Sequence, residues 1–316
     1  MDFGLHLRRP VSAEEAAGLR RMGLSTVTVP LSWRWAETRE GQWDLASVDH
    51  FLAPLRAADV PLQGSLGPAF THWLPEHVVA QGSADAADFV PRLAAACARL
   101  AAGCPDIAVF RVEDALNGAW LWDGLRTRRR RGRAWRDAGF RDDLLAACLD
   151  AVRAARPDAE LRITLDASLP GWRRTLRRWA SRGLAADRLG LRVDPCRHLA
   201  DPALAARAGE AVAQAIALWP GPVEVSHLTY STRNANFSPR RQREFLVEAA
   251  RSAQEAGAAG LHWGPLRDQA WDDPMLGYWV PERERSVGLA YYDGTPKAAL
   301  DELRVLSTGD RFGEGG

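Results

Sequence analysis

Eight short β-rich segments alternate with amphipathic segments rich in alanine and arginine, and this regular alternation restricts the possible folds more than any other feature. We predict strands at residues 3–7, 26–30, 62–66, 107–113, 161–165, 189–193, 223–227 and 260–264. The predicted helices span residues 13–22, 45–58, 84–102, 141–155, 172–183, 202–218, 239–256 and 296–306, and Ser12, Asp201 and Ser238 are helix-start signals. Such alternation favours parallel pairing through right-handed crossovers. Eight units predict an α/β fold, a (β/α)8 TIM barrel, with an open doubly wound sheet as the alternative.

The length of the chain fits one such barrel. We expect a single (β/α)8 barrel domain over residues 1–316, with residues 307–316 as a flexible tail, because no linker or low-complexity segment divides the 316 residues. The long connections follow the second, third, fourth and eighth predicted strands. These connections leave the carboxyl ends of strands, which is the face where such barrels build their sites. A functional site is therefore predicted there.

Composition limits the classes of function. The formal net charge of +1 argues against a nucleic-acid partner. No basic-then-apolar leader and no membrane-spanning run are visible, so we expect a cytoplasmic protein without a membrane partner. The four cysteines, Cys97, Cys104, Cys148 and Cys196, form no C-x-x-C pair and are expected to be buried free thiols. Lys297 is the single lysine, which we interpret as compositional bias without functional meaning.

His227 ends the seventh predicted strand, and an imidazole is well suited to acid or base catalysis near neutral pH. Glu113 ends the fourth predicted strand, and Asp114 follows it directly. Because neighbouring strand residues point to opposite faces, one of these two carboxyl groups is expected in the pocket. The alternatives are a hydrogen-bonded strand-end histidine, and a carboxylate paired with Arg111. Glu224 is expected to face the helix layer and to pair with an arginine.

Further polar residues follow other predicted strands. Asp166, Asp194 and Asp268 end or follow the fifth, sixth and eighth strands, where aspartates bind substrate or brace loops and helix starts. His6 ends the first strand and is a candidate for lining the pocket floor. We predict no metal site and no cofactor, because these aspartates and histidines are not spaced as a local ligand motif.

Aromatic and basic residues gather in the loops of the same face. Seven of the thirteen tryptophans lie in or beside these loops, and indole rings stack on sugar faces or pack over a barrel mouth. They are Trp33, Trp73, Trp120, Trp122, Trp263, Trp271 and Trp279. A basic run at residues 126–133 follows the fourth strand. It could attract an anionic group, or it could form a solvated loop.

Several motifs follow one another in a characteristic order. They are Trp33-Arg34-Trp35-Ala36-Glu37 with Gly41-Gln42-Trp43-Asp44, Trp73-Leu74-Pro75, Glu113-Asp114-Ala115-Leu116-Asn117, the strand at 223–227, His262-Trp263-Gly264-Pro265 with Asp268 and Trp271, and Asp293-Gly294-Thr295-Pro296-Lys297-Ala298. In this order they resemble the retaining (β/α)8 glycoside hydrolase clan, with the closest likeness to the family 10 xylanases. The likeness covers nearly the whole chain and implies a sugar-cleaving barrel.

The resemblance also implies roles for particular residues. The acid/base glutamate of the family falls on Asp114, and Asn117 ends the same motif and joins the predicted substrate-binding residues. The tryptophan that floors the reactive subsite falls on Trp263, with Trp33 and Trp271 also expected against the substrate. The nucleophilic glutamate falls on His227. The chain therefore departs from the family at the residue on which retaining chemistry depends.

The sugar ligands of the family are also replaced. The strand 2 ligands fall on Thr28, Val29 and Ser32, and the strand 3 histidine falls on Ser65. The sixth-strand region, which carries a glutamine and a histidine in the family, reads Val-Asp-Pro-Cys from Val193. The resemblance therefore implies the architecture and the location of the pocket, but not the cleavage of xylan.

These observations lead to one main hypothesis and two alternatives. Retaining hydrolysis needs two carboxyl groups about 5–5.5 Å apart, and a neutral imidazole cannot stabilise an oxocarbenium-like transition state. We therefore predict an enzyme that acts on a glycoside or a sugar-containing small metabolite by acid/base chemistry without the usual nucleophile. The alternatives are a repurposed non-hydrolytic biosynthetic enzyme (cyclisation, elimination or transfer) and a catalytically dead, ligand-binding pseudoglycosidase. A carbohydrate or other small molecule is the expected ligand.

Overall fold

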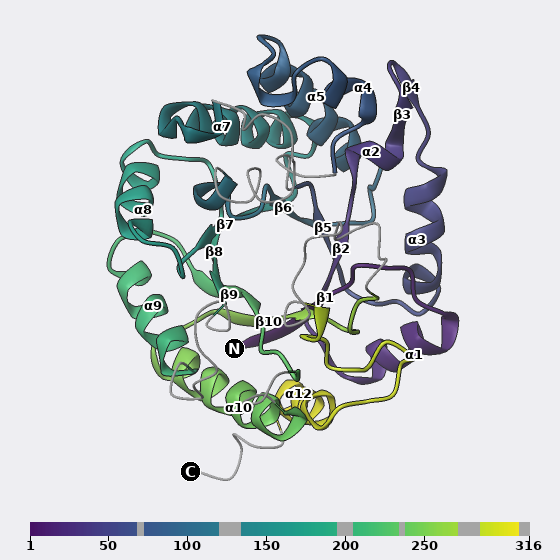
Figure 1. Cartoon of the computed structure of the whole chain (residues 1–316), viewed down its shortest axis with the longest axis vertical. Helices are drawn as coiled ribbons and strands as arrows, with labels where there is room; N and C mark the ends of the chain where they lie inside the picture. Colours follow the sequence, from purple (N-terminus) through teal and green to yellow (C-terminus); the bar gives the residue numbers. More distant parts are fainter. Residues whose placement is uncertain (68–72, 120–133, 195–204, 234–237, 271–284, 310–316) are drawn as a thin grey trace. The chain divides into compact units, whose positions relative to one another are not determined.

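The computed structural model describes residues 1–67, 73–119, 134–194, 205–233, 238–270 and 285–309. Eight parallel strands close into a barrel in the order β1-β10-β9-β8-β7-β6-β5-β2 (Figure 1). They are β1 (Asp2–His6), β2 (Thr26–Pro30), β5 (Leu62–Ser65), β6 (Val109–Val112), β7 (Glu160–Asp166), β8 (Arg188–Val193), β9 (Val223–Leu228) and β10 (Gly260–Pro265). The predicted (β/α)8 TIM barrel is confirmed, and each predicted strand overlaps one of these eight.

The helices of the barrel are close to the predicted segments. They are α1 (Ala13–Arg21), α3 (Ala46–Ala57), α5 (Phe89–Ala102), α7 (Ala138–Ala155), α8 (Trp172–Ser181), α9 (Ala206–Ile216), α10 (Pro239–Glu255) and α12 (Ala298–Thr308). Ser12 and Glu15 form a reciprocal capping box at the start of α1. Ser238 accepts a hydrogen bond from the backbone N–H of Arg241 at the start of α10. The third predicted cap, Asp201, lies outside the described residues.

The chain groups into two compact units. Unit 1 contains residues 1–28, 54–61 and 190–316, and unit 2 contains residues 29–53 and 62–189. Within unit 1, α10 packs against both α9 and α12 (Figure 1). Within unit 2, α5 packs along α7. The packed faces are small and aliphatic; Ala249, Ala250 and Ala253 of α10, for example, are fully buried.

Short elements that the sequence did not predict decorate the connections of unit 2. They are the helices α2 (Trp33–Ala36) and α4 (Glu76–Ala80), the antiparallel pair β3 (Glu37–Arg39) and β4 (Gln42–Trp43), and the 3₁₀ helices η1 (Ser83–Asp85), η2 (Leu116–Gly118) and η3 (Ala134–Arg136). Gly41 turns the β3–β4 hairpin with φ of 76°. Most of these elements extend the connections that follow the second, third and fourth barrel strands, where the sequence predicts the functional face.

Two irregularities change which side chains share a face near the carboxyl ends of β9 and β10. Val225 of β9 pairs with Leu261, but the next pair joins Leu228 and Trp263, so β9 advances three residues while β10 advances two. A second shift lies between Leu5 and His6 of β1. Such bulges re-aim side chains and are common beside active sites.

The chain end and the cysteines allow two further comparisons with the sequence. Helix α12 continues through Thr308, beyond the point where the tail is predicted to begin, and the Ser307 hydroxyl donates a hydrogen bond to the Met22 carbonyl. Residues 310–316 lie outside the described residues. Cys97, Cys104 and Cys148 are buried free thiols, as predicted, and Cys196 is not described. Among the described helices, none is long and apolar enough to cross a bilayer.

Candidate functional site at the carboxyl ends of the barrel strands

Three histidines of unit 1 gather in the barrel. The ring of His6 lies 5.0 Å from that of His227 in an edge-on contact and 6.1 Å from that of His262. Nε2 of His6 lies 2.6 Å from the backbone carbonyl oxygen of Ser226, which fixes a protonated Nε2 as the hydrogen-bond donor. His6 and His227 are both buried, at 5% and 3% exposure. The predicted site residues His6 and His227 are therefore brought together by β1 and β9.

The position of Glu224 differs from the prediction that this residue faces the helix layer. Its Oε2 lies 3.9 Å from Nε2 of His262, and the residue is fully buried. The prediction assumed uninterrupted alternation along β9, which would put Glu224 and His227 on opposite faces. The bulge between Val225 and Leu228 breaks that alternation. Glu224 therefore lies near His262, and His227 lies near His6 in the same cluster. Glu224 was missed as a site candidate because nothing in the sequence marks the bulge, and His262 was missed because its neighbour Trp263 was expected to face the pocket.

Trp263 packs against a helix instead of offering its ring to a ligand. It is fully buried, its indole N–H donates to the carbonyl of Val287 at 3.0 Å, and its ring meets Phe245 of α10 edge-on. The side chain therefore faces the helix layer. Alternation along β10 then turns His262 to the barrel interior, and a Cβ added at Gly4 would lie 2.8 Å from its ring. The predicted role of Trp263 in the reactive subsite is corrected to packing.

The two acidic candidates of unit 2 occupy a strained turn after β6. Glu113 and Ala115 have φ values of 58° and 55°, in the left-handed region that residues with a Cβ rarely adopt. Such strain is typical of functional sites, where the surrounding structure holds it. Glu113 is buried, whereas Asp114 is partly exposed. Asp114 is therefore the more accessible carboxyl group of the two.

Within unit 2, Glu113 lies close to Gly67 and near Cys148. Gly67 leaves room for it, since a Cβ at that position would approach the Cα of Glu113 to 2.8 Å and its carboxylate to 3.0 Å. The pKa of the Cys148 thiol in α7 is raised well above its usual value, first by the neighbouring Cys97 and by burial, and also by the charge of Glu113. Glu113 therefore acts electrostatically on a residue of the helix layer.

Asn117 and Asp166 brace each other. The Asn117 amide donates to the backbone carbonyl of Asp166 at 2.9 Å and accepts from its backbone N–H at 2.8 Å. The Asp166 carboxylate accepts from the N–H of Ser168 at 2.9 Å. These bonds favour the bracing alternative for Asp166, and they give Asn117, predicted as a substrate ligand, a bracing contact as well. In unit 1, Asp194 is buried, with its carboxylate 3.9 Å from the guanidinium of Arg192.

Trp33 is also held by a protein partner. Its indole N–H donates to Glu37 at 2.5 Å, and the side chain is buried. The same carboxylate accepts from the N–H of Gly41 at 2.6 Å and lies 3.8 Å from His77. The structure therefore gives Trp33 a packing role in the connection after β2. Trp271, the remaining predicted aromatic contact, lies outside the described residues.

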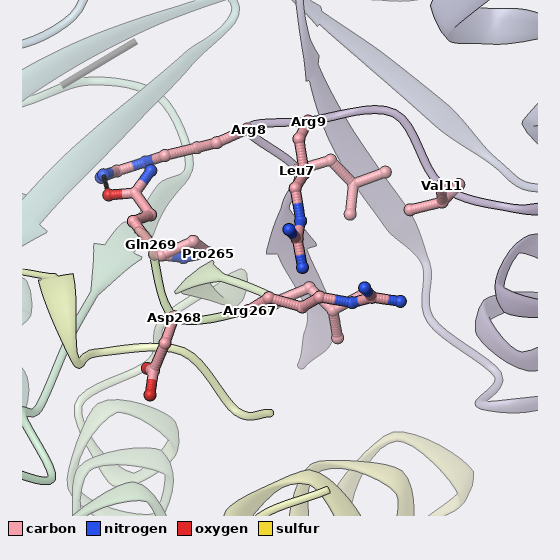
Figure 2. Close-up of a pocket in the computed structure, with 9 residues that line it drawn as sticks. Leu7, Arg8, Arg9, Val11, Pro265, Arg267, Asp268 and Gln269 are labelled. Carbon is pink, nitrogen blue, oxygen red and sulfur yellow. Dashed lines mark hydrogen bonds between the residues drawn. The ribbon is translucent and has the colours of Figure 1, made fainter. Parts of the chain in front are cut away.

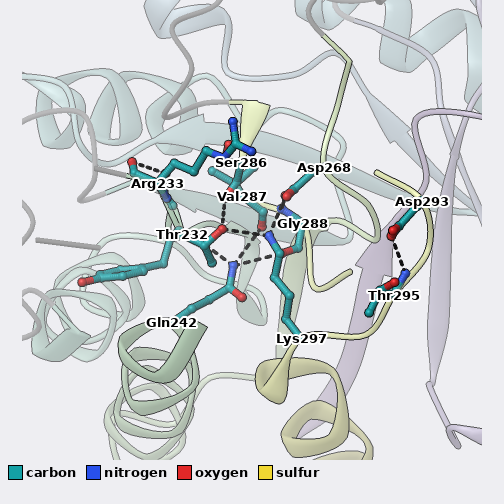
Figure 3. Close-up of polar contacts among 12 residues, drawn as sticks. Thr232, Arg233, Gln242, Asp268, Ser286, Val287, Gly288, Asp293, Thr295 and Lys297 are labelled. Atoms are coloured by element: carbon teal, nitrogen blue, oxygen red, sulfur yellow. Dashed lines mark hydrogen bonds and ion pairs between the residues drawn. The ribbon is translucent and has the colours of Figure 1, made fainter. Parts of the chain in front are cut away.

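Lys297 has a role that composition did not indicate. Its fully buried ammonium donates to Asp268 at 2.7 Å, to the Thr232 hydroxyl at 2.9 Å and to the Gly288 carbonyl at 3.0 Å (Figure 3). Asp268 also accepts from the N–H of Gly288 at 2.9 Å. Burial raises the pKa of Asp268 and lowers the pKa of Lys297, and the attraction between the two charges opposes both shifts. The predicted substrate ligand Asp268 is thus half of a buried ion pair.

Two hollows of unit 1 adjoin Asp268. The first, between Arg8, Arg9 and Arg267, encloses about 20 Å³, which is room for about one water molecule (Figure 2). The second encloses about 420 Å³, within the range of small-molecule sites. Its walls are formed by Arg233, Asp268, Gln269, Arg285, Ser286, Tyr291, Tyr292 and Asp293. Only the second of these two hollows can hold a sugar.

Metal chemistry receives no support from the described side chains. No group of three histidine, cysteine, aspartate or glutamate residues within the described ranges is placed to hold a metal ion. The described histidine cluster of unit 1 instead offers imidazole nitrogens for proton transfer. The predicted partnership of His227 with Asp114 joins residues of the two units and stays a prediction.

The closed parallel barrel resembles, in its fold, several glycoside hydrolases of known structure. The whole chain superposes on the GH5_18 protein from Streptomyces cattleya in complex with GlcNAc, with a TM-score of 0.78, 16% identity and 81% of that chain covered. For the exo-β-1,4-mannosidase Op5Man5 from Opitutaceae bacterium strain TAV5 the TM-score is 0.74 at 17% identity, over 98% of this chain. This chain spans 59% of the length of that mannosidase.

A psychrophilic glycoside hydrolase family 10 endo-β-1,4-xylanase gives a TM-score of 0.66 at 12% identity, with 96% of each chain covered. The fold likeness therefore extends to family 5 as well as to the family 10 enzymes that the motifs resemble. At these identities the likeness concerns the fold alone. No protein-family model matches the chain, and no curated protein matches it in sequence.

Proposed function

We propose that this protein is a carbohydrate-active enzyme that acts on a glycoside or a sugar-containing metabolite through acid/base chemistry, with His227 in place of a carboxylate nucleophile. The observation that carries the proposal is the position of His227 at the carboxyl end of β9, in edge-on contact with His6, in a barrel whose structural neighbours are glycoside hydrolases. Strand ends on this face supply the catalytic groups of such barrels.

The chemistry follows from the properties of the imidazole. Neutral His227 can accept a proton from water or from a substrate hydroxyl, and the resulting oxygen nucleophile can attack a carbon electrophile. His6, whose Nε2 donates to the Ser226 carbonyl, holds its ring edge against His227 and limits the orientations of that ring. Asp114 is the proposed acid, because it is the partly exposed residue of the strained turn after β6. A carboxylic acid can protonate a departing oxygen.

The test is a panel of aryl glycosides and disaccharides assayed with the wild-type protein, His227→Ala and Asp114→Asn. We expect turnover of at least one compound by the wild-type protein and its loss in both variants, while circular dichroism and Tm report intact folds. Normal turnover in both variants would refute the assigned roles. Sugar binding without turnover of any compound would favour the ligand-binding pseudoglycosidase, and release of an eliminated or cyclised product would favour the non-hydrolytic enzyme.

A second variant tests whether the remainder of a retaining site survives. His227→Glu restores a carboxylate at the position that the resemblance assigns to the nucleophile. We expect it to release nitrophenol from an activated aryl glycoside in a burst, because a glycosyl-enzyme intermediate would then accumulate. His227→Gln is the matched control, with similar size and no charge. Equal inactivity of the two variants would show that the retaining machinery is absent.

A further inference from the structure

The hollow of about 420 Å³ in unit 1 lies at the same ends of β9 and β10 as His227. Arg233 follows β9, and Asp268 and Gln269 follow β10. The rest of the lining comes from residues 285–286 and 291–293, which precede α12. We propose that this hollow binds the anionic group of a sugar that carries a carboxylate or a phosphate. The proposal rests on the proposed function and names its substrate class.

The lining carries two arginines, Arg233 and Arg285, beside two aspartates. Asp268 is neutralised by Lys297, whose ammonium lies 2.7 Å away and is itself fully buried. Asp293 is exposed and accepts from the N–H of Thr295, which lowers its pKa, with a smaller contribution from Arg267 (Figure 3). Arg233 also lowers the pKa of Asp268, as Lys297 does, so its charge is partly engaged with that carboxylate. Arg285 is therefore the cationic group of the lining that we assign to the ligand.

Two hydrogen-bond donors in the lining of the hollow support an anionic ligand. The Nε atom of Arg285 is buried and has no hydrogen-bond partner among the described residues. The same is true of Nε2 of Gln269, whose Oε1 is occupied by Arg8 at 2.8 Å (Figure 2). A buried donor without an acceptor costs about 1–3 kcal/mol. Carboxylate or phosphate oxygens would relieve this cost, and a guanidinium binds both groups through two parallel bonds.

Aromatic rings on the same wall supply the surface that a sugar ring needs. Tyr291 and Tyr292 are 41% and 55% exposed, which is high for adjacent large side chains. The ammonium of Lys297 lies 5.0 Å from the ring centre of Tyr291, and the guanidinium of Arg9 lies 4.8 Å from that of Tyr292. These cation–π contacts restrain the two rings. Tyrosine rings stack on the apolar face of a sugar, as tryptophan rings do.

The experiment measures binding directly by calorimetry, without turnover. Glucuronate, glucose 6-phosphate, inorganic phosphate and glucose are titrated into the wild-type protein, Arg285→Met and Arg233→Met. The matched control is Arg240→Met, an exposed arginine of α10 that pairs with Glu244 on the helix surface. We expect the anionic sugars to bind at least tenfold more tightly than glucose. Each pocket variant should reduce that preference at least tenfold, and the control should leave it unchanged.

The remaining outcomes separate the two sources of negative charge and the two proposals. Preference for glucuronate assigns a carboxylate sugar, and preference for glucose 6-phosphate assigns a phosphorylated one. Binding of inorganic phosphate as tightly as the sugars would overturn a sugar site, and equal binding of glucose and the anionic sugars would overturn an anionic one. Selective binding of anionic sugars with no turnover in the glycoside panel would support this pocket while refuting the proposed function.

Discussion

The two ends of the barrel strands hold their buried polar residues differently. At the amino ends of β5, β7 and β8 in unit 2, Arg162 donates to Glu160 at 2.7 Å and to Gln63 at 3.1 Å, and Arg188 lies 3.1 Å from the same glutamate. At the carboxyl ends of β1 and β9 in unit 1, the rings of His6 and His227 meet edge-on at 5.0 Å. The first group fixes charges through short bonds. The second places imidazole rings in contact through their edges.

Two arginines of unit 2, Arg111 and Arg162, are unusual because they face the barrel interior. Phe110 lies beneath the guanidinium of Arg156 at the end of α7, so its neighbour Arg111 must point away from the helices. Arg111 and Arg162 are register partners and share that face. Such interiors are usually filled by valine, isoleucine and leucine. Buried charges require partners, and the hydrogen bonds of Arg162 to Glu160 and Gln63 supply them. We conclude that the network at the amino ends is structural, and the functional site that we propose lies at the carboxyl ends.

His227→Gln gives the sharpest test of this difference. The glutamine side chain is close in volume to that of histidine but cannot exchange a proton near neutral pH, so kcat should fall about a thousandfold on the substrate that the panel identifies. The free energy of unfolding should change by no more than about 1 kcal/mol, because the volume is nearly kept. Steady-state kinetics and urea unfolding measure the two quantities. A large loss of stability with kcat preserved would make His227 structural, like Arg162.

Lys297→Met should have the largest effect on stability. The substitution leaves the Asp268 carboxylate, which is only 13% exposed, without its nearest cation, and breaking such a pair costs roughly 3 kcal/mol. The double variant Lys297→Met/Asp268→Asn should recover most of the loss, because no unpaired charge remains. Urea unfolding of the two variants measures the difference. If both variants lose the same stability, the charge of Asp268 is not the cause.

The pH dependence of Lys297→Met has a defined sign. Burial already raises the pKa of Asp268, and removal of Lys297 raises it further because the ammonium lowers it. The folded variant then binds this proton more tightly than the unfolded chain does. Its stability should therefore be greatest below the unfolded pKa of about 4 and should fall as pH rises through the folded pKa. The gap between variant and wild type should be wider at pH 7 than at pH 4.

The fold could be predicted from the sequence to within a few residues, because strands and helices follow from local periodicity. The second predicted strand, residues 26–30, coincides with β2, and each of the others overlaps its strand. The site was less accessible to the same reasoning. Strand-end placement brought out His6 and His227, which depend only on where a strand ends. The bulge that lets Glu224 and His227 share a face depends on pairing between β9 and β10, which periodicity along one strand does not contain.

Partner choice was the second obstacle. Trp33, Asn117 and Asp268 are residue types that can bind sugars. Each is instead bonded to a protein partner, which is distant in the sequence for Asn117 and Asp268 and lies in the nearby turn for Trp33. The single lysine was interpreted as compositional bias, yet its uniqueness could have been the signal. Forty of the 41 basic residues are arginines. The position of Lys297 suits a compact ammonium with three donors, which a guanidinium could not replace.

Arg162→Met tests the amino-end network. Glu160 is partly exposed and keeps Arg188, so we expect the free energy of unfolding to fall by roughly 2 kcal/mol, less than for a fully buried pair. The kcat of the folded variant should stay unchanged, because the network lies at the opposite ends of the strands from the proposed chemistry. Arg251→Met, which removes an exposed helix pair, is the matched control and should change stability by less than about 0.5 kcal/mol. A loss of kcat without a loss of stability would reverse the assignment of the two ends.

Ala115→Gly has the smallest expected effect and tests the strained turn at the carboxyl end of β6. Glycine relieves the left-handed φ, worth about 1 kcal/mol, but loses a buried methyl group worth about 0.8 kcal/mol, so stability should barely change. If the strain holds Asp114 in place, the added freedom should lower kcat roughly tenfold with KM unchanged. Kinetics and urea unfolding on the same preparation separate the two effects. An unchanged kcat would mean that the turn is strained for packing around Glu113, and the carboxyl end of β6 would then belong with the structural network instead of with His227.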